Sequence, residues 1–212
     1  MKLAVVANVK LKAELLTTEP QAEVKFVWLK SAGELMNHPD ADAVIDLLFE
    51  NKEEEIVLLN EFLPKPVIIN SVIKTIGEIN LPFIRINGWP TFLKREIIEA
   101  ATNNERNKIE GEIIFTAFRK KTEWVPDIIG FISPRVVAMI INEAYFTLEE
   151  NVSTKAEIDT AMKLGTNYPY GPFEWGQKIG LKNILDLLNN LSSEEKRYQP
   201  APLLVKEVLE NK

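Results

Sequence analysis

Few side chains of this 212-residue protein are suited to proton transfer or nucleophilic attack. The chain has one histidine, His38, and no cysteine. Histidine is the most common general base in enzymes because its pKa lies near neutrality. His38 lies in the polar segment 36–40, which favours a surface loop over a catalytic position. A serine triad at Ser71 or Ser133 is not predicted either, because such a triad needs a histidine beside the serine.

The same residue counts argue against a metal site. With one histidine and no cysteine, only carboxylates are left as ligands. The acidic run 53–55 is better explained as the first turn of a helix, where negative charge stabilises the helix dipole. The sequence contains no Walker loop, nucleophile elbow or HExxH motif. We therefore expect no metal centre.

Composition limits the partners and the compartment. The net charge of −6 argues against a nucleic-acid partner, which would favour a basic surface. No stretch approaches the roughly 20 apolar residues that span a bilayer. The apolar run at residues 1–8 is too short for a signal peptide. We expect a cytoplasmic protein without a membrane partner.

The first half of the chain alternates strand-like and helix-like segments. Strands are predicted at 3–7, 24–29, 43–48, 66–70 and 83–87, and helices at 9–16 and 53–62. The apolar runs lack period-2 alternation, which indicates strands buried on both faces of a parallel sheet. Residues 95–101 fit a helix or a strand, and residues 112–118 are β-prone but allow a helix. Residues 124–127 fit an edge strand or a turn, because proline donates no ladder hydrogen bond.

The second half is predicted to be helical. Helices are expected at 135–150, 173–179, 183–191 and 202–209. Another helix is expected to begin at Ser153, although Glu157 lies one residue too far away for a capping box. Gly165 is the expected C-cap of that helix. We place the domain boundary near Asp127, which gives domains 1–127 and 128–212.

Five segments of the second half carry a family resemblance. They are Gly130-Phe131-Ile132, Asn142-Glu143-Ala144, Asp159 to Gly165, Tyr168 to Glu174, and Arg197 to Leu204. In this order they resemble the helical C-terminal domain of the 3-hydroxyacyl-CoA dehydrogenases, an NAD-dependent oxidoreductase family. The first half follows the same plan more loosely, at 42–50, 69–71 and 76–79.

The resemblance implies an architecture. It is α/β plus all-α: a reduced Rossmann-like, parallel-sheet domain at 1–127, followed by a helical dimerisation domain at 128–212. It also implies a homodimer through the C-terminal helices, a place in fatty acid metabolism, and NAD as cofactor if the family activity is retained.

The cofactor turn departs from the family pattern. The family's first strand leads into a Gly-x-Gly-x-x-Gly turn, whose glycines let backbone amides approach the NAD pyrophosphate. The corresponding residues are Ala7, Val9 and Lys12. Val9 would put a branched side chain where the pyrophosphate needs space, and no acidic residue ends the second strand at 28–30. Lys10 and Lys12 are either replacement phosphate ligands or solvated lysines at a helix start.

The family's catalytic histidine is also missing. It is expected directly after the strand at 83–87, where the sequence has none. Arg85 stays protonated and Asn87 has no useful basicity, so neither replaces it. Glu99 matches the family glutamate that orients this histidine, with Glu96 as the alternative if the alignment slips. Without the histidine, the glutamate is a surface carboxylate or a structural hydrogen-bond acceptor.

Further differences lie in the substrate-binding parts. Pro134-Arg135 replaces the family's Asn-Arg pair, and about Ile73 replaces its substrate-contacting serine. Only residues 30–41 separate the second strand from the third, where the family has a longer helical insertion that helps cover the CoA ester. Losses in several separate parts of the chain argue against dehydrogenase activity.

The sequence therefore predicts a catalytically degenerate 3-hydroxyacyl-CoA dehydrogenase-like protein with a structural or ligand-binding role. No cofactor is expected, and the ligand would be an acyl-CoA or another small molecule. One alternative is an active NAD-dependent oxidoreductase of the same family that uses an unrecognised base. The other is a non-catalytic partner subunit of a complete dehydrogenase.

Overall fold

The computed structural model describes residues 1–210 and forms two compact units, which divide between Phe131 and Ile132. The boundary expected from the sequence, near Asp127, lies a few residues earlier.

The first unit contains a seven-stranded sheet in the order β2-β1-β3-β4-β5-β6-β7. The strands are β1 (Lys2–Val6), β2 (Lys25–Leu29), β3 (Ala43–Asp46), β4 (Val67–Asn70), β5 (Ile84–Ile86), β6 (Ile97–Ala101) and β7 (Lys121–Trp124). All neighbouring strands pair in parallel except β5 and β6, which are antiparallel. The predicted Rossmann-like, mostly parallel sheet is thus confirmed, with one antiparallel pairing that the sequence did not reveal.

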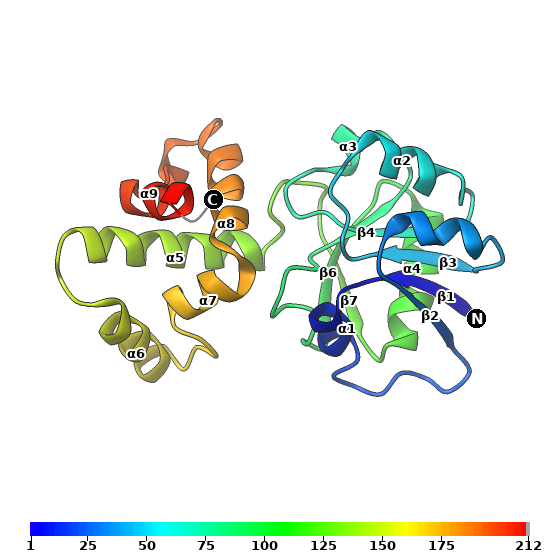
Figure 1. Cartoon of the computed structure of the whole chain (residues 1–212), viewed down its shortest axis with the longest axis horizontal. Coiled ribbons are helices and arrows are strands. Elements are labelled where there is room, and N and C mark those ends of the chain that lie inside the picture. Colours follow the sequence, from blue (N-terminus) through cyan, green and yellow to red (C-terminus); the bar gives the residue numbers. More distant parts are fainter. Residues whose placement is uncertain (211–212) are drawn as a thin grey trace. The chain divides into compact units, whose positions relative to one another are not determined.

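Helices cover both faces of this sheet (Figure 1). They are α1 (Val9–Leu15), the 3-10 helix η1 (Ala32–Asn37), α2 (Glu53–Asn60), α3 (Ile76–Ile79) and α4 (Glu105–Ala117). Leu3 and Val5 of β1 pack in the core on the side of α1 and α4, whereas Ala4 and Val6 pack on the side of η1, α2 and α3. Successive strand residues point to opposite faces, so a strand covered on both sides is apolar throughout.

The structure decides all three segments with open predictions. Of residues 124–127, Trp124 ends the edge strand β7 and the other three lie outside the sheet. Residues 97–101 form strand β6, and residues 112–117 lie inside helix α4. Helix α4 begins at Asn104, whose side chain accepts hydrogen bonds from the next turn. Ile114 and Phe115 are buried against the sheet while Ile113 is exposed, so burial of one helical face overrides the local β propensity.

The second unit is helical, as predicted. Its elements are α5 (Ser133–Glu149), α6 (Lys155–Thr166), α7 (Pro172–Ile179), α8 (Leu181–Ser192), the 3-10 helix η2 (Lys196–Tyr198) and α9 (Pro202–Glu210). Helix α5 packs against α7, α8 and α9. Its buried face carries Val137, Ile141 and Tyr145, which recur at helical spacing.

Two helix-end predictions for α6 are wrong. The N-cap is Thr154 rather than Ser153, and Thr154 forms a complete capping box with Glu157 at the expected spacing. Gly165 lies inside the helix and is not its C-cap. Asn167 takes that position with a φ of 55°, because asparagine is, after glycine, the residue that most often adopts the left-handed conformation.

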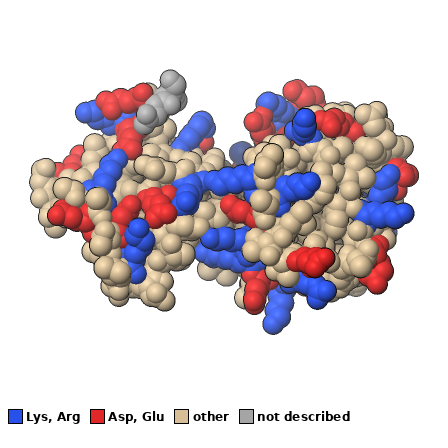
Figure 2. All heavy atoms as spheres, turned by 60° about the horizontal axis from the view of Figure 1, so that its bottom comes forward, with Lys and Arg blue, Asp and Glu red and all other residues tan. Residues whose placement is uncertain are grey.

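The surface carries both signs of charge over both units, with lysines and arginines lying next to acidic side chains on the face in Figure 2. Several of these groups pair along helices, as Lys182 does with Asp186. Within residues 1–210, every helix is too short or too polar to cross a membrane.

Candidate functional site at the carboxyl edge of the sheet

Polar residues gather where the parallel strands end. Asp46 is the last residue of β3, Asn70 is the last of β4, and Asn87 directly follows β5. The carboxyl ends of parallel strands lie at one edge of the sheet, and ligands of open α/β sheets bind outside that edge. This edge is therefore the candidate site.

Asn70 ties three strand ends together. Its Nδ2 donates to the carbonyl of Leu47 (3.2 Å), and its Oδ1 accepts the backbone N–H of Gly88 (3.0 Å). A Cβ on Gly88 would lie 2.8 Å from Cγ of Asn70, so only glycine fits there. Both polar atoms of this amide are engaged, and the chain after β5 is fixed closely against β4.

Asn87 and Glu99 form a buried pair. Asn87 Nδ2 donates to Glu99 Oε2 (3.0 Å), and the Asn87 backbone N–H donates to the Glu99 carbonyl (3.0 Å). Asn87 is 3% exposed and Glu99 is 8% exposed, whereas Glu96 lies on the surface. Of the two glutamates considered from the sequence, Glu99 is thus the one against Asn87. Asn87 Oδ1 has no hydrogen-bond partner among residues 1–210.

Charged and strained groups lie on the segment that follows Asn87. The Arg95 guanidinium interacts electrostatically with Glu99, and the buried Lys120 ammonium donates to the Arg95 carbonyl (2.8 Å). Burial lowers the pKa of Lys120. Thr91 has a φ of 80°, and its N–H donates to Glu14 Oε2 (2.7 Å). A β-branched residue in this conformation is rare and costs roughly 1–3 kcal/mol, which the surrounding contacts must offset.

Asp46 is a second buried carboxylate at the edge. It is fully buried, its Oδ1 accepts the N–H of Leu48 (2.9 Å), and its Oδ2 accepts no hydrogen bond in the described part of the chain. When protonated, the Asp46 carboxyl can donate to the carboxylate of Glu55. Burial, and to a lesser extent the negative charge of Glu55, raises the pKa of Asp46 to about 7. A carboxyl group at this position therefore exchanges its proton near neutral pH.

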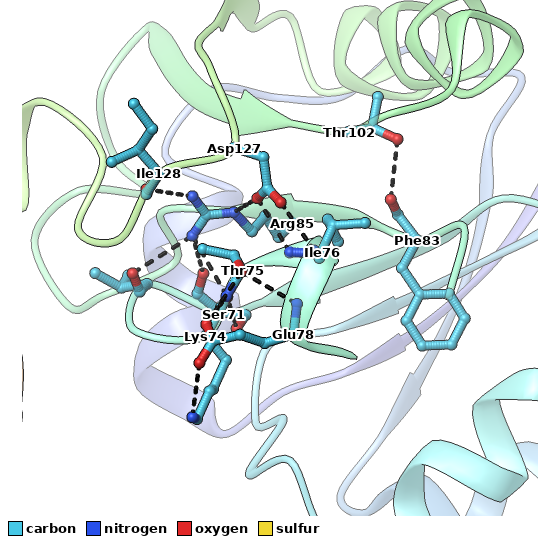
Figure 3. A network of polar contacts seen from close by, with 12 residues as sticks. Ser71, Lys74, Thr75, Ile76, Glu78, Phe83, Arg85, Thr102, Asp127 and Ile128 are labelled. Atoms are coloured by element: carbon cyan, nitrogen blue, oxygen red, sulfur yellow. Dashed lines mark hydrogen bonds and ion pairs between the residues drawn. The ribbon is translucent and has the colours of Figure 1, made fainter. Parts of the chain in front are cut away.

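Arg85 of β5 is fully buried and makes contacts along two loops (Figure 3). Its guanidinium donates to Asp127 Oδ1 (2.6 Å), to the Ser71 carbonyl (3.0 Å) and to the Ile128 carbonyl. The ring of Phe131 lies over it, 4.3 Å from Cζ. Burial lowers the pKa of Arg85, and the charge of Asp127 opposes that shift.

The carboxylate of Asp127 also accepts the N–H groups of Ile76 (3.0 Å) and Gly77 (2.9 Å) at the start of α3. Arg85 and Asp127 therefore connect the segment 71–77 to the segment 127–131. This explains why the first compact unit extends to Phe131 instead of ending at Asp127. Through these contacts Arg85 has a structural role in holding the two segments together.

The turn between β1 and α1 is an ordinary capped helix start. The Asn8 side chain accepts the N–H of Leu11 (2.9 Å), and Val9 is 87% exposed at the first helical position. None of the positive-φ residues found in the range 1–210 lies between Ala7 and Lys12. Lys12 Nζ lies 4.6 Å from the ring centre of Trp28, so it is more than a solvated lysine.

Glu34 was not recognised from the sequence. Its carboxylate accepts the Lys30 N–H (3.3 Å) and the Ser31 hydroxyl (3.4 Å), directly after β2. Glu34 lies within a 3-10 helix, several residues after the strand. A search for an acidic residue at the end of the strand therefore does not find it. His38 lies at the end of the same helix, before β3, and so at the other end of that strand from Asp46.

In the helical unit, the polar motif residues connect helices. Asp159 accepts the N–H groups of Phe173 (2.8 Å) and Glu174 (3.1 Å) at the start of α7. Asn142 donates to the Gln199 carbonyl (2.9 Å) and accepts the Ala201 N–H (2.8 Å). Over residues 1–210 no group of three or more His, Cys, Asp or Glu side chains is arranged to hold a metal ion.

Comparison with known proteins identifies related sequences and structures. Residues 130–212 match the family model described as 3-hydroxyacyl-CoA dehydrogenase, C-terminal domain. The Bacillus subtilis protein named Probable 3-hydroxybutyryl-CoA dehydrogenase is 28% identical over 213 aligned positions, which cover 93% of this chain and 74% of that protein. Residues 130–212 therefore belong to that C-terminal domain family, and the whole chain resembles 3-hydroxyacyl-CoA dehydrogenases.

Two further dehydrogenases match, one in sequence over half of the chain and one in fold over nearly all of it. The 3-hydroxyadipyl-CoA dehydrogenase of Escherichia coli K12 is 44% identical over 50% of this chain, which spans only 23% of that relative. The (S)-3-hydroxybutyryl-CoA dehydrogenase of Ralstonia eutropha has the same fold, with a TM-score of 0.74 and 19% identity over 99% of this chain and 94% of that one.

Proposed function

We propose that this protein is a catalytically degenerate 3-hydroxyacyl-CoA dehydrogenase-like protein that retains a ligand-binding role. One observation carries the proposal. The carboxamide of Asn87 donates to Glu99 at the end of β5, where the family pattern calls for a histidine paired with a glutamate. A carboxamide cannot take up the hydroxyl proton that must leave when a hydride is transferred.

The β1–α1 turn supports the same proposal. The Asn8 side chain already uses the Leu11 N–H, one of the donors that a pyrophosphate would need. Val9 is exposed at the helix start, where the family's glycine leaves room for the phosphate. The Glu34 carboxylate lies where a ribose acceptor would be expected, but it already accepts two local donors. These residues do not fit the dinucleotide in the way the family's glycines do.

Two measurements test the proposal. Calorimetry with NAD is expected to give no binding in the micromolar range. An assay for hydride transfer from a short 3-hydroxyacyl-CoA to NAD is expected to give no NADH above the rate without protein. Tight NAD binding together with turnover would contradict the proposal.

A second candidate function is an active oxidoreductase with a different base, and Asp46 favours it. This buried carboxylate has a pKa of about 7, which suits a general base. If the protein oxidises a 3-hydroxyacyl-CoA, the Asp46→Asn variant should lose that activity. The Glu61→Gln variant, which changes a surface residue, should retain it. Turnover that persists in Asp46→Asn would exclude Asp46 as the base.

We further propose that the helical unit associates, either with a second copy or with a complete family member. Ile132, Val136 and Leu164 are exposed apolar residues of this unit. Light scattering should give the mass of a homodimer, whose total is about twice the 24.1 kDa of the chain. A monomer that co-purifies with a full-length dehydrogenase would favour the partner-subunit role instead.

A further inference from the structure

Residues 87 and 88 form the one Asn-Gly dipeptide of the sequence. In such a pair the backbone nitrogen of glycine can attack the carboxamide carbon of asparagine, because glycine has no side chain to hinder the ring closure. A bond forms between the Gly88 nitrogen and Cγ of Asn87, and Nδ2 leaves as ammonia. Water then opens the cyclic imide at either carbonyl, which gives aspartate or isoaspartate in place of asparagine.

The packing around Gly88 explains why this reactive pair is present. Gly88 lies so close to Asn70 that a Cβ on it would be 2.8 Å from Cγ of Asn70 and 2.9 Å from Oδ1. Alanine or any larger residue is therefore excluded unless the Asn70 side chain moves. The close contact between the chain after β5 and the end of β4 thus requires the residue that makes Asn87 chemically labile.

The same contact occupies the attacking nitrogen. The Gly88 N–H donates to Asn70 Oδ1 at 3.0 Å, and this nitrogen must lose its proton before it can attack. Asn70 is itself held in place, because its Nδ2 donates to the Leu47 carbonyl at 3.2 Å. A backbone N–H that is hydrogen-bonded within the fold loses its proton mainly when that part of the fold opens.

The carboxamide that would be attacked is restrained as well. Asn87 Nδ2 donates to Glu99 Oε2, and the Asn87 N–H donates to the Glu99 carbonyl, both at 3.0 Å. Ring closure brings Cγ of Asn87 onto the Gly88 nitrogen and so turns the carboxamide away from Glu99. Asn87 is 3% exposed, which also limits access of the water that completes the reaction.

We propose that Asn87-Gly88 is a deamidation site that the fold keeps unreacted, and that the hydrogen bond from Gly88 to Asn70 is the contact that protects it. The reaction proceeds from chains in which the end of β4 and the segment after β5 have separated. Its products lose the Nδ2 donor to Glu99, and isoaspartate also lengthens the backbone, so the conversion damages this edge of the sheet irreversibly. The chemistry at Asn87 does not depend on whether the protein transfers hydride.

The first test compares the full chain at neutral pH in buffer and in concentrated guanidinium chloride, at one temperature. Peptide mass spectrometry measures the fraction of Asn87 that has become aspartate or isoaspartate over time. Asn87 is expected to react at least about a hundredfold faster in the denaturant, because the protecting fold is then absent. A ratio below about tenfold, or no reaction at Asn87 in the denaturant, would overturn the proposal.

Two substitutions of Asn70 isolate the protecting contact in the folded protein. Asn70→Asp and Asn70→Leu both lose the donor to the Leu47 carbonyl, but only Asn70→Asp keeps an oxygen that can accept the Gly88 N–H. In buffer, Asn87 should react about tenfold faster in Asn70→Leu than in Asn70→Asp, the effect of roughly one hydrogen bond. Equal rates in the two folded variants would overturn the assignment of the protection to Asn70.

Asn37 is the internal reference for these variants. It is exposed in the 3-10 helix η1 and is followed by His38 instead of glycine. Its reaction should be slow and should have the same rate in the parent protein and in both Asn70 variants. A variant in which Asn37 also reacts faster, or whose circular dichroism is that of an unfolded chain, has lost the whole fold. The comparison of the parent protein in buffer and in denaturant then decides the proposal.

Discussion

The two units of the molecule treat their buried polar residues differently. In the helical unit, Asn142 uses both polar atoms of its side chain and Asp159 uses both oxygens. In the sheet unit, Asp46 and Asn87 each have one oxygen that accepts no hydrogen bond from the described residues. Every buried side-chain atom without a hydrogen bond in the range 1–210 belongs to the sheet unit; these atoms are in Asp46, Asn87, Glu110 and Thr122.

This difference distinguishes polar residues that hold the fold together from polar residues that the fold alone does not explain. Asn142 and Asp159 belong to the motifs that carry the family resemblance, and their contacts join helices, so the fold alone accounts for them. The free oxygens of Asp46 and Asn87 make no such contribution to the fold. They lie at the edge where α/β proteins bind ligands, and a proton or a ligand is the expected partner.

Arg85 gives the largest expected effect, because it is a fully buried charge with several hydrogen-bond partners. In Arg85→Met, Asp127 would lose its charged partner, and the free energy of unfolding should fall by roughly 3–5 kcal/mol. Urea denaturation measures this loss. Lys52→Met removes a surface pair with Glu50 and should change stability little. A small loss in Arg85→Met would mean that the network contributes little to the fold.

Asp159→Ala tests the same idea in the helical unit. The variant leaves the N–H groups of Phe173 and Glu174 uncapped at the start of α7, and we expect a loss of about 1–2 kcal/mol. Asp186→Ala, which removes only a surface pair with Lys182, serves as the control. If both variants unfold at the same urea concentration as the parent protein, the motif is not structural.

Asp46 should respond to pH, since its folded pKa of about 7 lies above the ordinary value of 3.8. The folded protein therefore holds a proton that the unfolded chain releases. The resulting stability is present below about pH 4 and is lost as the pH rises through about 7. Asp46→Asn should remove this dependence and unfold less readily at about pH 8, by on the order of 1 kcal/mol. Parallel pH profiles of the variant and the parent protein would contradict the assignment.

Gly165 gives the smallest expected effect. It lies inside α6, and a Cβ built on it meets no atom within 4 Å. Gly165→Ala should therefore stabilise the protein by about 0.5–1 kcal/mol, through the lower backbone entropy of alanine. Thermal unfolding measures this gain. A loss of stability would instead indicate that Gly165 is a C-cap with positive φ.

The sequence predicted the fold wherever the signal was local. The apolar runs identified the first strands, and the helical periodicity identified α5 and the helices after it. The nature of residues 97–101 and 112–117 depended on which face the tertiary structure buries, which no local pattern contains. The antiparallel pairing of β5 with β6 joins neighbouring strands whose direction depends on the path of the chain between them.

The candidate site was predicted only in part. Glu99 was identified through the resemblance, but its contact with Asn87 required the pairing of β5 with β6. In the sequence, Asp46 is only the last residue of an otherwise apolar strand. The structure is needed to show that one of its oxygens accepts no hydrogen bond. The strained φ of Thr91 has no sequence signature, because threonine is not a residue that usually adopts it.

Under our proposal, Asn87 lies where the family's base is expected and the protein does not transfer hydride. The most direct measurement is NADH formation from a short 3-hydroxyacyl-CoA, with a complete member of the family as the positive control. We expect a rate equal to that without protein, at every pH between about 6 and about 9. A rate that scales with protein concentration and survives further purification would contradict it.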